Sequence, residues 1–176
     1  MSRRSSAGLR PPRKRTELEA PLHWAWRAGP VDDGPAVVFD IDGVLSDAAS
    51  RQHFIEIDDW YAFFDACGDD PLIEEVARLI ELLDDELVIV LLTGRPVRVR
   101  PQTLAWLDRY HLRWDLLIMR DMGDYSAARR FKQRTVADLR QWGFDLRLAF
   151  EDDRRNRQMF HDEGVPCIYI HSGYYD

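Results

Sequence analysis

Two aspartates separated by one residue, Asp40 and Asp42, follow an apolar run and precede a glycine. The run 36–41 has the composition of a buried parallel strand, and open parallel sheets bind their ligands at the carboxyl ends of the strands. One carboxylate of such a pair can attack an electrophile or bind a metal while its neighbour moves a proton. The pair therefore predicts a catalytic site, and a strand followed by a solvated acidic turn is the alternative for this motif taken alone.

A second apolar run, 87–92, is followed by Thr93, Gly94 and Arg95. A hydroxyl, a flexible turn and a guanidinium are suited to holding phosphate oxygens, and arginine can make a bidentate contact. Lys132, on a helix expected further along the chain, can add a fixed positive charge to the same crevice. Each signal is weak alone, but their order at successive strand ends favours phosphate chemistry.

A third polar group, Glu151, Asp152 and Asp153, follows the apolar run 146–150. Two acidic clusters at neighbouring strand ends repel each other unless a cation lies between them. Carboxylate oxygens are hard ligands that favour Mg²⁺. The sequence therefore predicts a magnesium site at this edge of the sheet.

Strand and helix patterns alternate along the chain. Strands are expected near 36–41, 87–92, 115–119, 146–150 and 166–170, and helices near 72–83, 101–110, 126–142 and 154–163. This alternation predicts one α/β domain with a doubly wound parallel sheet of about five strands and helices on both faces. Trp24, Trp26 and Trp142 are interpreted as core or edge packing.

Composition is consistent with one domain and excludes several classes. The chain has 176 residues, of which 45% are hydrophobic, and no apolar run approaches the roughly 18 residues of a membrane span. The cysteines, Cys67 and Cys167, are too few and too far apart for a disulfide scaffold or zinc site. They indicate reduced thiols and a cytoplasmic protein.

Charge is uneven along the chain. The first 20 residues carry six basic and two acidic side chains, whereas the whole chain has a net charge of −7. We therefore expect a basic, disordered tail over 1–22 and a net acidic domain over 23–176. The tail could attract a polyanion, and a solvated leader without a role is the equal alternative.

Together these motifs resemble the haloacid dehalogenase superfamily of phosphotransferases, over about residues 34–173. The resemblance lies in Asp40–Gly43, Thr93, Lys132 and the acidic pair Asp152–Asp153. It implies a Rossmann-like fold and a phosphatase with a Mg²⁺ cofactor. Asp40 is the implied nucleophile and Asp42 the implied acid/base. The implied metal ligands are Asp40, Asp42, Asp152 and Asp153.

A narrower resemblance is to the phosphatase domain of phage-type polynucleotide kinase–phosphatase. It is carried by Arg51, by Gly94–Arg95 and by Asp152–Asp153–Arg154. The implied phosphate-binding residues are Arg51, Thr93, Gly94, Arg95 and Lys132. Ser126 and Ala128 depart from that group, which has Arg and Asp there, and Arg129 or Arg130 could compensate. No Gly-x-x-x-x-Gly-Lys-Ser/Thr loop supports a kinase activity.

The interval 48–68 is long enough for a flap or a short helix but not for a full cap domain. An open site of this kind admits a nucleic-acid 3′ end or a nucleotide. Its candidate stacking residues, although such aromatic residues more often pack against the core, are His53, Phe54, Trp60, Tyr61, Phe63 and Phe64. Three hypotheses follow: a Mg²⁺-dependent phosphatase of nucleic-acid 3′ ends or nucleotides, a sugar-phosphate phosphatase, and a degenerate phosphate- or partner-binding module.

Overall fold

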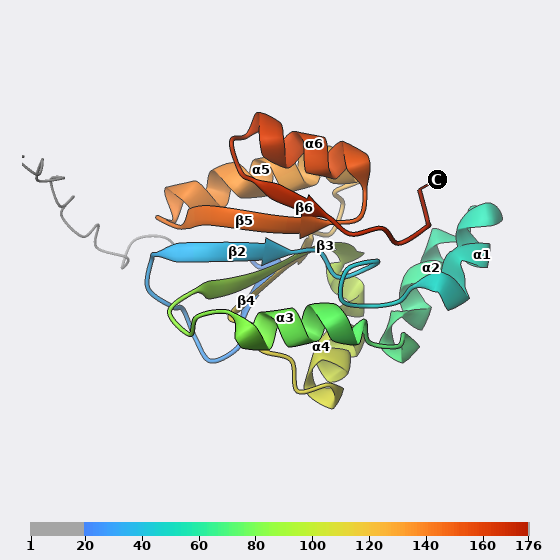
Figure 1. The fold of residues 1–176 in the computed structure, drawn as a ribbon. Helices are drawn as coiled ribbons and strands as arrows, with labels where there is room; N and C mark the ends of the chain where they lie inside the picture. The colour runs from blue at the N-terminus through green and yellow to red at the C-terminus, as the bar shows by residue number, and fades with distance from the viewer. Residues whose placement is uncertain (1–19, 176) are drawn as a thin grey trace, which may run out of the picture.

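The apolar runs form a six-stranded sheet in the computed structural model, which describes residues 20–175 (Figure 1). The strands, in their order across the sheet, are β1 (Trp24–Trp26), β4 (Leu116–Arg120), β3 (Val88–Pro96), β2 (Pro35–Phe39), β5 (Asp145–Glu151) and β6 (Cys167–Tyr169). All neighbouring strands from β4 to β6 are parallel. The predicted α/β class and its five parallel strands are therefore confirmed.

The sixth strand, β1, was not predicted. It pairs antiparallel with β4, and Trp24 lies opposite Ile118. Its two tryptophans pack beside Trp142, with ring centroids 5.3 Å and 6.2 Å away. The edge packing expected of these tryptophans is thus present, but a run of three residues is too short to show the alternation that identifies a strand.

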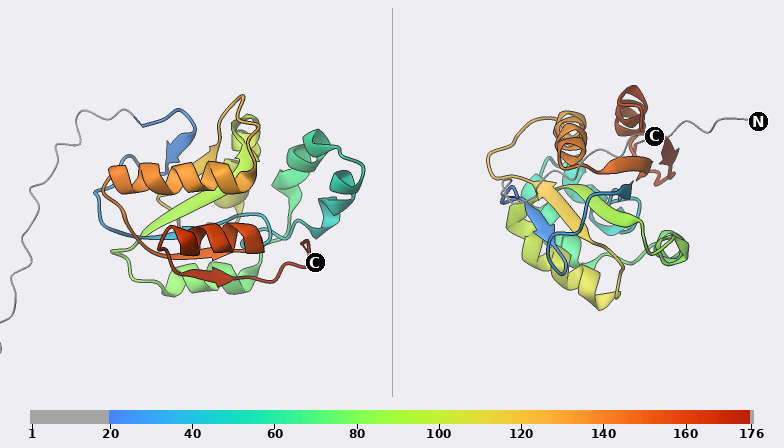
Figure 2. Two further views of the ribbon diagram at one scale, coloured as in Figure 1. Left: turned by 90° about the horizontal axis from the view of Figure 1, so that it is seen from above. Right: turned by 90° about the vertical axis from the view of Figure 1, so that its left-hand side faces the viewer.

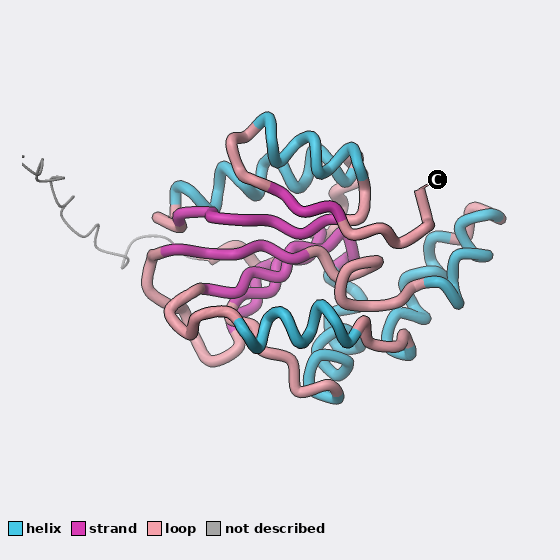
Figure 3. The backbone as a smooth tube through the Cα atoms, viewed as in Figure 1, coloured by secondary structure: helices cyan, strands magenta, loops and turns pink. Residues whose placement is uncertain are grey.

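Helices cover both faces of the sheet, as Figures 1 and 3 show. Helices α3 (Glu74–Leu82) and α4 (Arg100–Arg109) lie on one face, and α5 (Ala128–Gln141) and α6 (Arg154–Asp162) lie on the other. Successive side chains of β2 alternate between the two cores: Val37 and Phe39 pack with the first layer, and Ala36 and Val38 with the second. A strand with two buried faces explains the uninterrupted apolar run before Asp40.

A small helical flap lies beyond the carboxyl ends of the strands (Figure 2). It consists of α1 (Gln52–Glu56) and α2 (Trp60–Asp65), flanked by 3₁₀ turns at Ala49–Arg51 and Ala66–Asp69. A third 3₁₀ turn, Val97–Val99, precedes α4. The flap occupies the interval in which the sequence predicted a flap rather than a cap domain.

Within residues 20–175, no helix has the length and apolar character needed to cross a membrane. Most of the predicted basic tail, residues 1–19, lies outside the described residues. The domain boundary at residue 23 therefore stays a prediction.

The stacked rings of Phe39 and Phe150 join β2 to β5 directly before the polar residues at their ends. The ring centroids are 4.5 Å apart, the planes are 1° from parallel, and both side chains are buried. We expect Phe39→Ala to lower the free energy of unfolding by about 3–5 kcal/mol, because it leaves a cavity in a packed core. Denaturant titration measures this loss. Leu82→Ala, at an exposed position of α3, is the control, and equal small losses in both variants would contradict the packing.

Candidate active site

Asp40 lies where β2 ends beside β5. Its backbone N–H donates to the Phe150 carbonyl at 3.0 Å, so the chain remains paired with β5 at this position. The backbone N–H of Ile41 donates to Asp40 Oδ1 at 2.7 Å, which fixes the carboxylate. The strand end therefore presents Asp40 in one orientation.

Lys132 joins Asp40 to Glu151 from the helix layer above them. It lies on the buried face of α5, and its Nζ donates to Asp40 Oδ2 and to Glu151 Oε2, each at 2.6 Å. Burial alone would lower the pKa of Lys132, but Asp40 and Glu151 raise it above its ordinary value. The ammonium group therefore stays charged between two carboxylates.

Asp40, Glu151 and Asp152 form a buried acidic cluster with ligand atoms within 4.8 Å of one another. Glu151 is already engaged, because its Oε1 accepts the backbone N–H groups of Asp152 and Asp153 at 3.2 Å. In contrast, neither carboxylate oxygen of Asp152 has a hydrogen-bond partner among the described residues. Burial, reinforced by the charge of Asp40, raises the pKa of Asp152 to about 7. Buried carboxylate oxygens without partners fit a hard divalent cation.

The turn after Asp42 leaves space for Asp152. Gly43 has φ +79°, and a Cβ at this position would lie 1.9 Å from Asp152 Oδ2. A side chain here would be strained by its backbone conformation and would also displace the carboxylate. The glycine of the motif therefore allows the first acidic strand end to approach the second.

Two buried arginines hold Asp42. Its Oδ1 accepts from Arg95 Nη2 at 2.6 Å and Nε at 3.0 Å, and from Arg51 Nη2 at 2.5 Å. Burial raises the pKa of this carboxyl group, but Arg95 and Arg51 oppose it and the pKa falls below its usual value. Asp42 is therefore held as a carboxylate.

Asp70 completes this network and was missed from the sequence. It pairs with Arg51 Nη2 at 2.7 Å and with Arg95 Nη2 at 3.3 Å, and it accepts a hydrogen bond from the Ser46 hydroxyl. Its backbone carbonyl also accepts from Trp106 Nε1 at 2.8 Å, which ties the network to α4. No local motif marks Asp70, because its partners are distant in the sequence.

These contacts change the interpretation of the predicted phosphate ligands. Arg51 and Arg95 are almost fully buried, and their guanidinium groups are occupied by carboxylates, so the structure places them on Asp42 rather than free for a substrate. Thr93 is also buried, and its Oγ1 accepts the Arg95 backbone N–H at 3.2 Å. Among this group, only Gly94 and Lys132 border the cavity described below.

Asp153 does not join the acidic cluster. Its carboxylate caps α6 by accepting the Arg155 backbone N–H at 2.8 Å, and it pairs with the Arg155 guanidinium at 2.9 Å. Glu151 takes its place in the cluster. The run Glu151–Asp152–Asp153 contained this residue, but the sequence did not show which of the three carboxylates turn inward.

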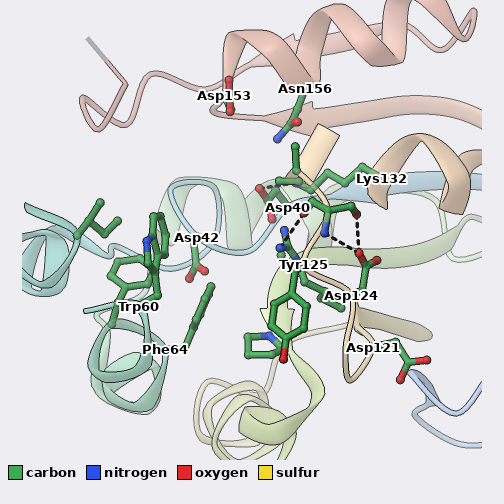
Figure 4. A pocket seen from close by; sticks show the side chains of 18 of the residues that line it. Asp40, Asp42, Trp60, Phe64, Asp121, Asp124, Tyr125, Lys132, Asp153 and Asn156 are labelled. Carbon is green, nitrogen blue, oxygen red and sulfur yellow. Dashed lines mark hydrogen bonds and ion pairs between the residues drawn. The ribbon is translucent and has the colours of Figure 1, made fainter. Parts of the chain in front are cut away.

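A cavity of about 1010 Å³ opens from Asp40 and Asp42 toward the flap. Four of the predicted aromatic residues border it, namely Trp60, Tyr61, Phe63 and Phe64. His53 and Phe54 do not, and their rings pack against each other with centroids 4.0 Å apart. Figure 4 shows the flap aromatics Trp60 and Phe64 near Asp42, and Tyr125 on the loop after β4. The site is therefore open enough for a substrate larger than a phosphate group.

The loop after β4 carries the departures Ser126 and Ala128, which both border the cavity. The arginines considered as replacements do not border it. Arg129 is exposed and lies 3.5 Å from Asp162, and Arg130 is also exposed. Compensation by either residue is therefore not seen in this arrangement.

Comparisons with known proteins identify the family and match the fold. The family model of the polynucleotide kinase PNKP phosphatase domain matches residues 34–175. Two solved chains from Pnkp1/Rnl/Hen1 complexes, one described as an RNA repair complex, share the fold with TM-scores of 0.68 and identities of 24% and 22%. The matches cover 89% and 94% of this chain but 47% and 58% of those chains, so this chain spans about half their length.

A haloacid dehalogenase-like hydrolase from Streptococcus pneumoniae has the same fold at lower similarity. Its TM-score is 0.55 at 11% identity, and the match covers 76% of this chain and 83% of that chain. No curated protein sequence matches the chain. Because the family model spans every element that positions the acidic cluster and Asp42, the chain belongs to the PNKP phosphatase-domain family and is a phosphoric monoester hydrolase of the haloacid dehalogenase superfamily.

Proposed function

We propose that this enzyme is a Mg²⁺-dependent phosphatase of nucleic-acid 3′ ends or nucleotides that acts through an aspartyl-phosphate on Asp40. The observation that carries the proposal is the position of Asp40. It borders the cavity on one side and joins the buried cluster of Glu151 and Asp152 on the other. A carboxylate in this position can contact a phosphate group in the cavity while Lys132 and a bound cation balance its negative charge.

Asp40 and Asp152 are the side chains that would hold the metal. When ionised, the three carboxylates of the cluster carry three negative charges, and Lys132 supplies one positive charge. A divalent cation balances the remaining two charges and, when bound, reduces the repulsion between the carboxylates and an incoming phosphate. Asp153, paired with Arg155, is not needed for this coordination.

The first chemical step forms a bond between an Asp40 oxygen and phosphorus while the bond to the leaving oxygen breaks. Asp42 must first take up a proton from solvent; it gives that proton to the leaving oxygen and then takes a proton from the water that attacks phosphorus, which releases phosphate and restores the Asp40 carboxylate. All the described arginine contacts of Asp42 reach Oδ1, so Oδ2 is available for proton transfer. The lowered pKa makes Asp42 a strong acid when protonated and favours the carboxylate that the second step needs.

The size of the cavity and the family match support a polynucleotide or nucleotide substrate. The opening is bordered by aromatic rings of the flap, and base–aromatic stacking stabilises single strands without sequence preference. The solved relatives include chains from an RNA repair complex. A cavity of this size has room for a base as well as for the reacting phosphate.

The proposal is tested by phosphate release from a 3′-phosphorylated oligonucleotide. We expect release that requires Mg²⁺ and falls by more than about 10³-fold in Asp40→Asn, because the amide cannot form the acyl phosphate. Asp85→Asn, an exposed change far from the cavity, is the control for lost charge. Near wild-type release by Asp40→Asn would refute the nucleophile, and release only from small phosphomonoesters would refute the substrate class.

The close approach of Gly43 to Asp152 makes a second prediction. Gly43→Ala should abolish the rise in melting temperature caused by Mg²⁺, because the new methyl group displaces Asp152 Oδ2. Gly164→Ala is the matched control, since Gly164 has φ +72° but no atom lies within 4 Å of the position that its methyl group would take. It should lose about 1–2 kcal/mol of stability from backbone strain and keep the Mg²⁺ response. An unchanged response in Gly43→Ala would count against Asp152 as a ligand.

The raised pKa of Asp152 makes a third prediction. In chelator, ionisation of Asp152 should destabilise the folded wild type as the pH rises from about 4 toward 7, because the folded pKa is about 7 and the ordinary value is 3.8. Above pH 7, Asp152→Asn should then be more stable than wild type by on the order of 1–4 kcal/mol. Saturating Mg²⁺ should reverse this order, because it stabilises only the form that binds it.

Asp153→Asn is the control for this reversal. Asparagine keeps the helix cap, so its stability should stay within about 1 kcal/mol of wild type with or without Mg²⁺. Denaturant titrations in chelator and in Mg²⁺ measure both variants. A stability order that does not change with metal would remove Asp152 from the metal site.

A further inference from the structure

One cation that borders the cavity has no carboxylate partner. Four cationic side chains border it, namely Arg98, Arg120, Lys132 and Arg155. Three of these are paired: Lys132 with Asp40 and Glu151, Arg155 with Asp153, and Arg98 with Asp65. Among the described residues, Arg120 makes no ion pair.

The guanidinium of Arg120 is positioned but not saturated. Its Nη1 donates to the Ser126 carbonyl at 3.1 Å, and its Cζ lies 5.8 Å from the centre of the Phe131 ring. Its Nε is buried without a hydrogen-bond partner, and Nη2 lies 3.7 Å from the point where a Cβ of Gly94 would be. The Nη2 donors of Arg120, beside Gly94, have no hydrogen-bond partner among the described residues and are left for a ligand.

The nearby carboxylates are engaged elsewhere. Asp124 accepts from Arg134 Nη2 at 2.6 Å and from the Ser126 hydroxyl at 2.5 Å. Asp121 lies 3.8 Å from His23 Nδ1. Figure 4 shows Asp121 and Asp124 on the loop after β4. Asp124 attracts the Arg120 guanidinium beyond ion-pair distance, but no described carboxylate contacts it directly, so its charge at the edge of the cavity is only partly compensated.

The sheet order places Arg120 beside the reacting centre rather than on it. Arg120 ends β4, and β3 separates this strand from β2, which carries Asp40 at its end. Two strand spacings amount to about 10 Å, part of which the side chain spans toward Gly94. The charges around Asp40 are already balanced by Lys132 and the proposed metal. A second anionic group of the substrate is the partner that fits Arg120.

We propose that Arg120 binds the phosphodiester that precedes the terminal phosphate of a polynucleotide substrate. This inference rests on the proposed function and adds to it the group that distinguishes a polynucleotide end from a mononucleotide. Guanidinium groups match phosphate oxygens with two parallel hydrogen bonds. A phosphodiester supplies a negative charge that neither a mononucleotide nor a sugar phosphate has outside its reacting group.

The test compares two substrates with the same reacting group. Thymidine 3′-monophosphate has no phosphodiester, and the dinucleotide dTpdT with a 3′-phosphate has one. We expect Arg120→Gln to lower kcat/KM for the dinucleotide by about tenfold or more, mainly through KM, because a charged hydrogen bond is lost. The mononucleotide value should change by less than about twofold. Arg129→Gln, which removes an exposed positive charge that pairs with Asp162 outside this cavity, should affect neither substrate by that amount.

Salt dependence separates a ligand contact from a structural role. The slope of log kcat/KM for the dinucleotide against log salt concentration should become shallower by about 0.7 in Arg120→Gln, the value for one single-strand phosphate contact. Arg120→Lys keeps the charge and should restore most of the slope. A variant that is merely less stable would lower both substrates alike and would show no such rescue.

The outcomes distinguish this inference from the proposed function. Equal losses on both substrates would assign Arg120 to the reacting phosphate or to folding, and no loss on either would remove it from substrate binding. Both results would overturn the inference while leaving the proposed function intact. If the wild type released phosphate from neither 3′-phosphorylated substrate, the proposed function would fail and the ligand assigned to Arg120 with it.

Discussion

The burial of like charges at adjoining strand ends is the constraint on which the site depends. Asp40, Glu151 and Asp152 are brought together by β2 and β5, and one ammonium group, that of Lys132, lies among them. Such a cluster is costly in a low-dielectric interior unless the charges are paired. The fold therefore leaves an excess of negative charge, when the carboxylates are ionised, at the place where the proposed chemistry needs a cation.

Arg51 and Arg95 were predicted to bind phosphate, but in the structure they pair with carboxylates of the protein. Arg51 and Arg95 bridge Asp42 and Asp70, so two cations and two anions form a network that fixes Asp42, the proposed proton-transfer group. In the proposed reaction, positive charge for the substrate would then come from the metal and from side chains that are not already paired. The sequence alone does not show which cationic side chains pair with carboxylates of the protein and which have no such partner; the contacts in the structure do.

Periodicity and strand-end chemistry predicted the architecture and the main acidic residues, because these signals are local. Asp40 directly follows an apolar run, and Lys132 lies within a segment of helical spacing. Both signals therefore lie within a few residues of the side chain that they predict. The role of Asp70 and the position of Glu151 in the cluster depend on partners elsewhere in the chain, and the pairing of Asp153 with Arg155 depends on how helix α6 begins. The strand β1 was missed for a related reason, since its pairing with β4 and not its own three residues defines it.

The wide separation of the paired residues has a consequence for folding. Lys132 lies 92 positions from Asp40, and Arg95 lies 53 positions from Asp42. Contacts of such high sequence separation close large loops, and proteins rich in them fold slowly. A partly folded chain, in which only elements adjacent in the sequence have packed together, has formed neither the Lys132–Asp40 pair nor the Arg95–Asp42 pair. In the proposed mechanism, catalytic competence is therefore a property of the completed topology rather than of any one segment of the chain.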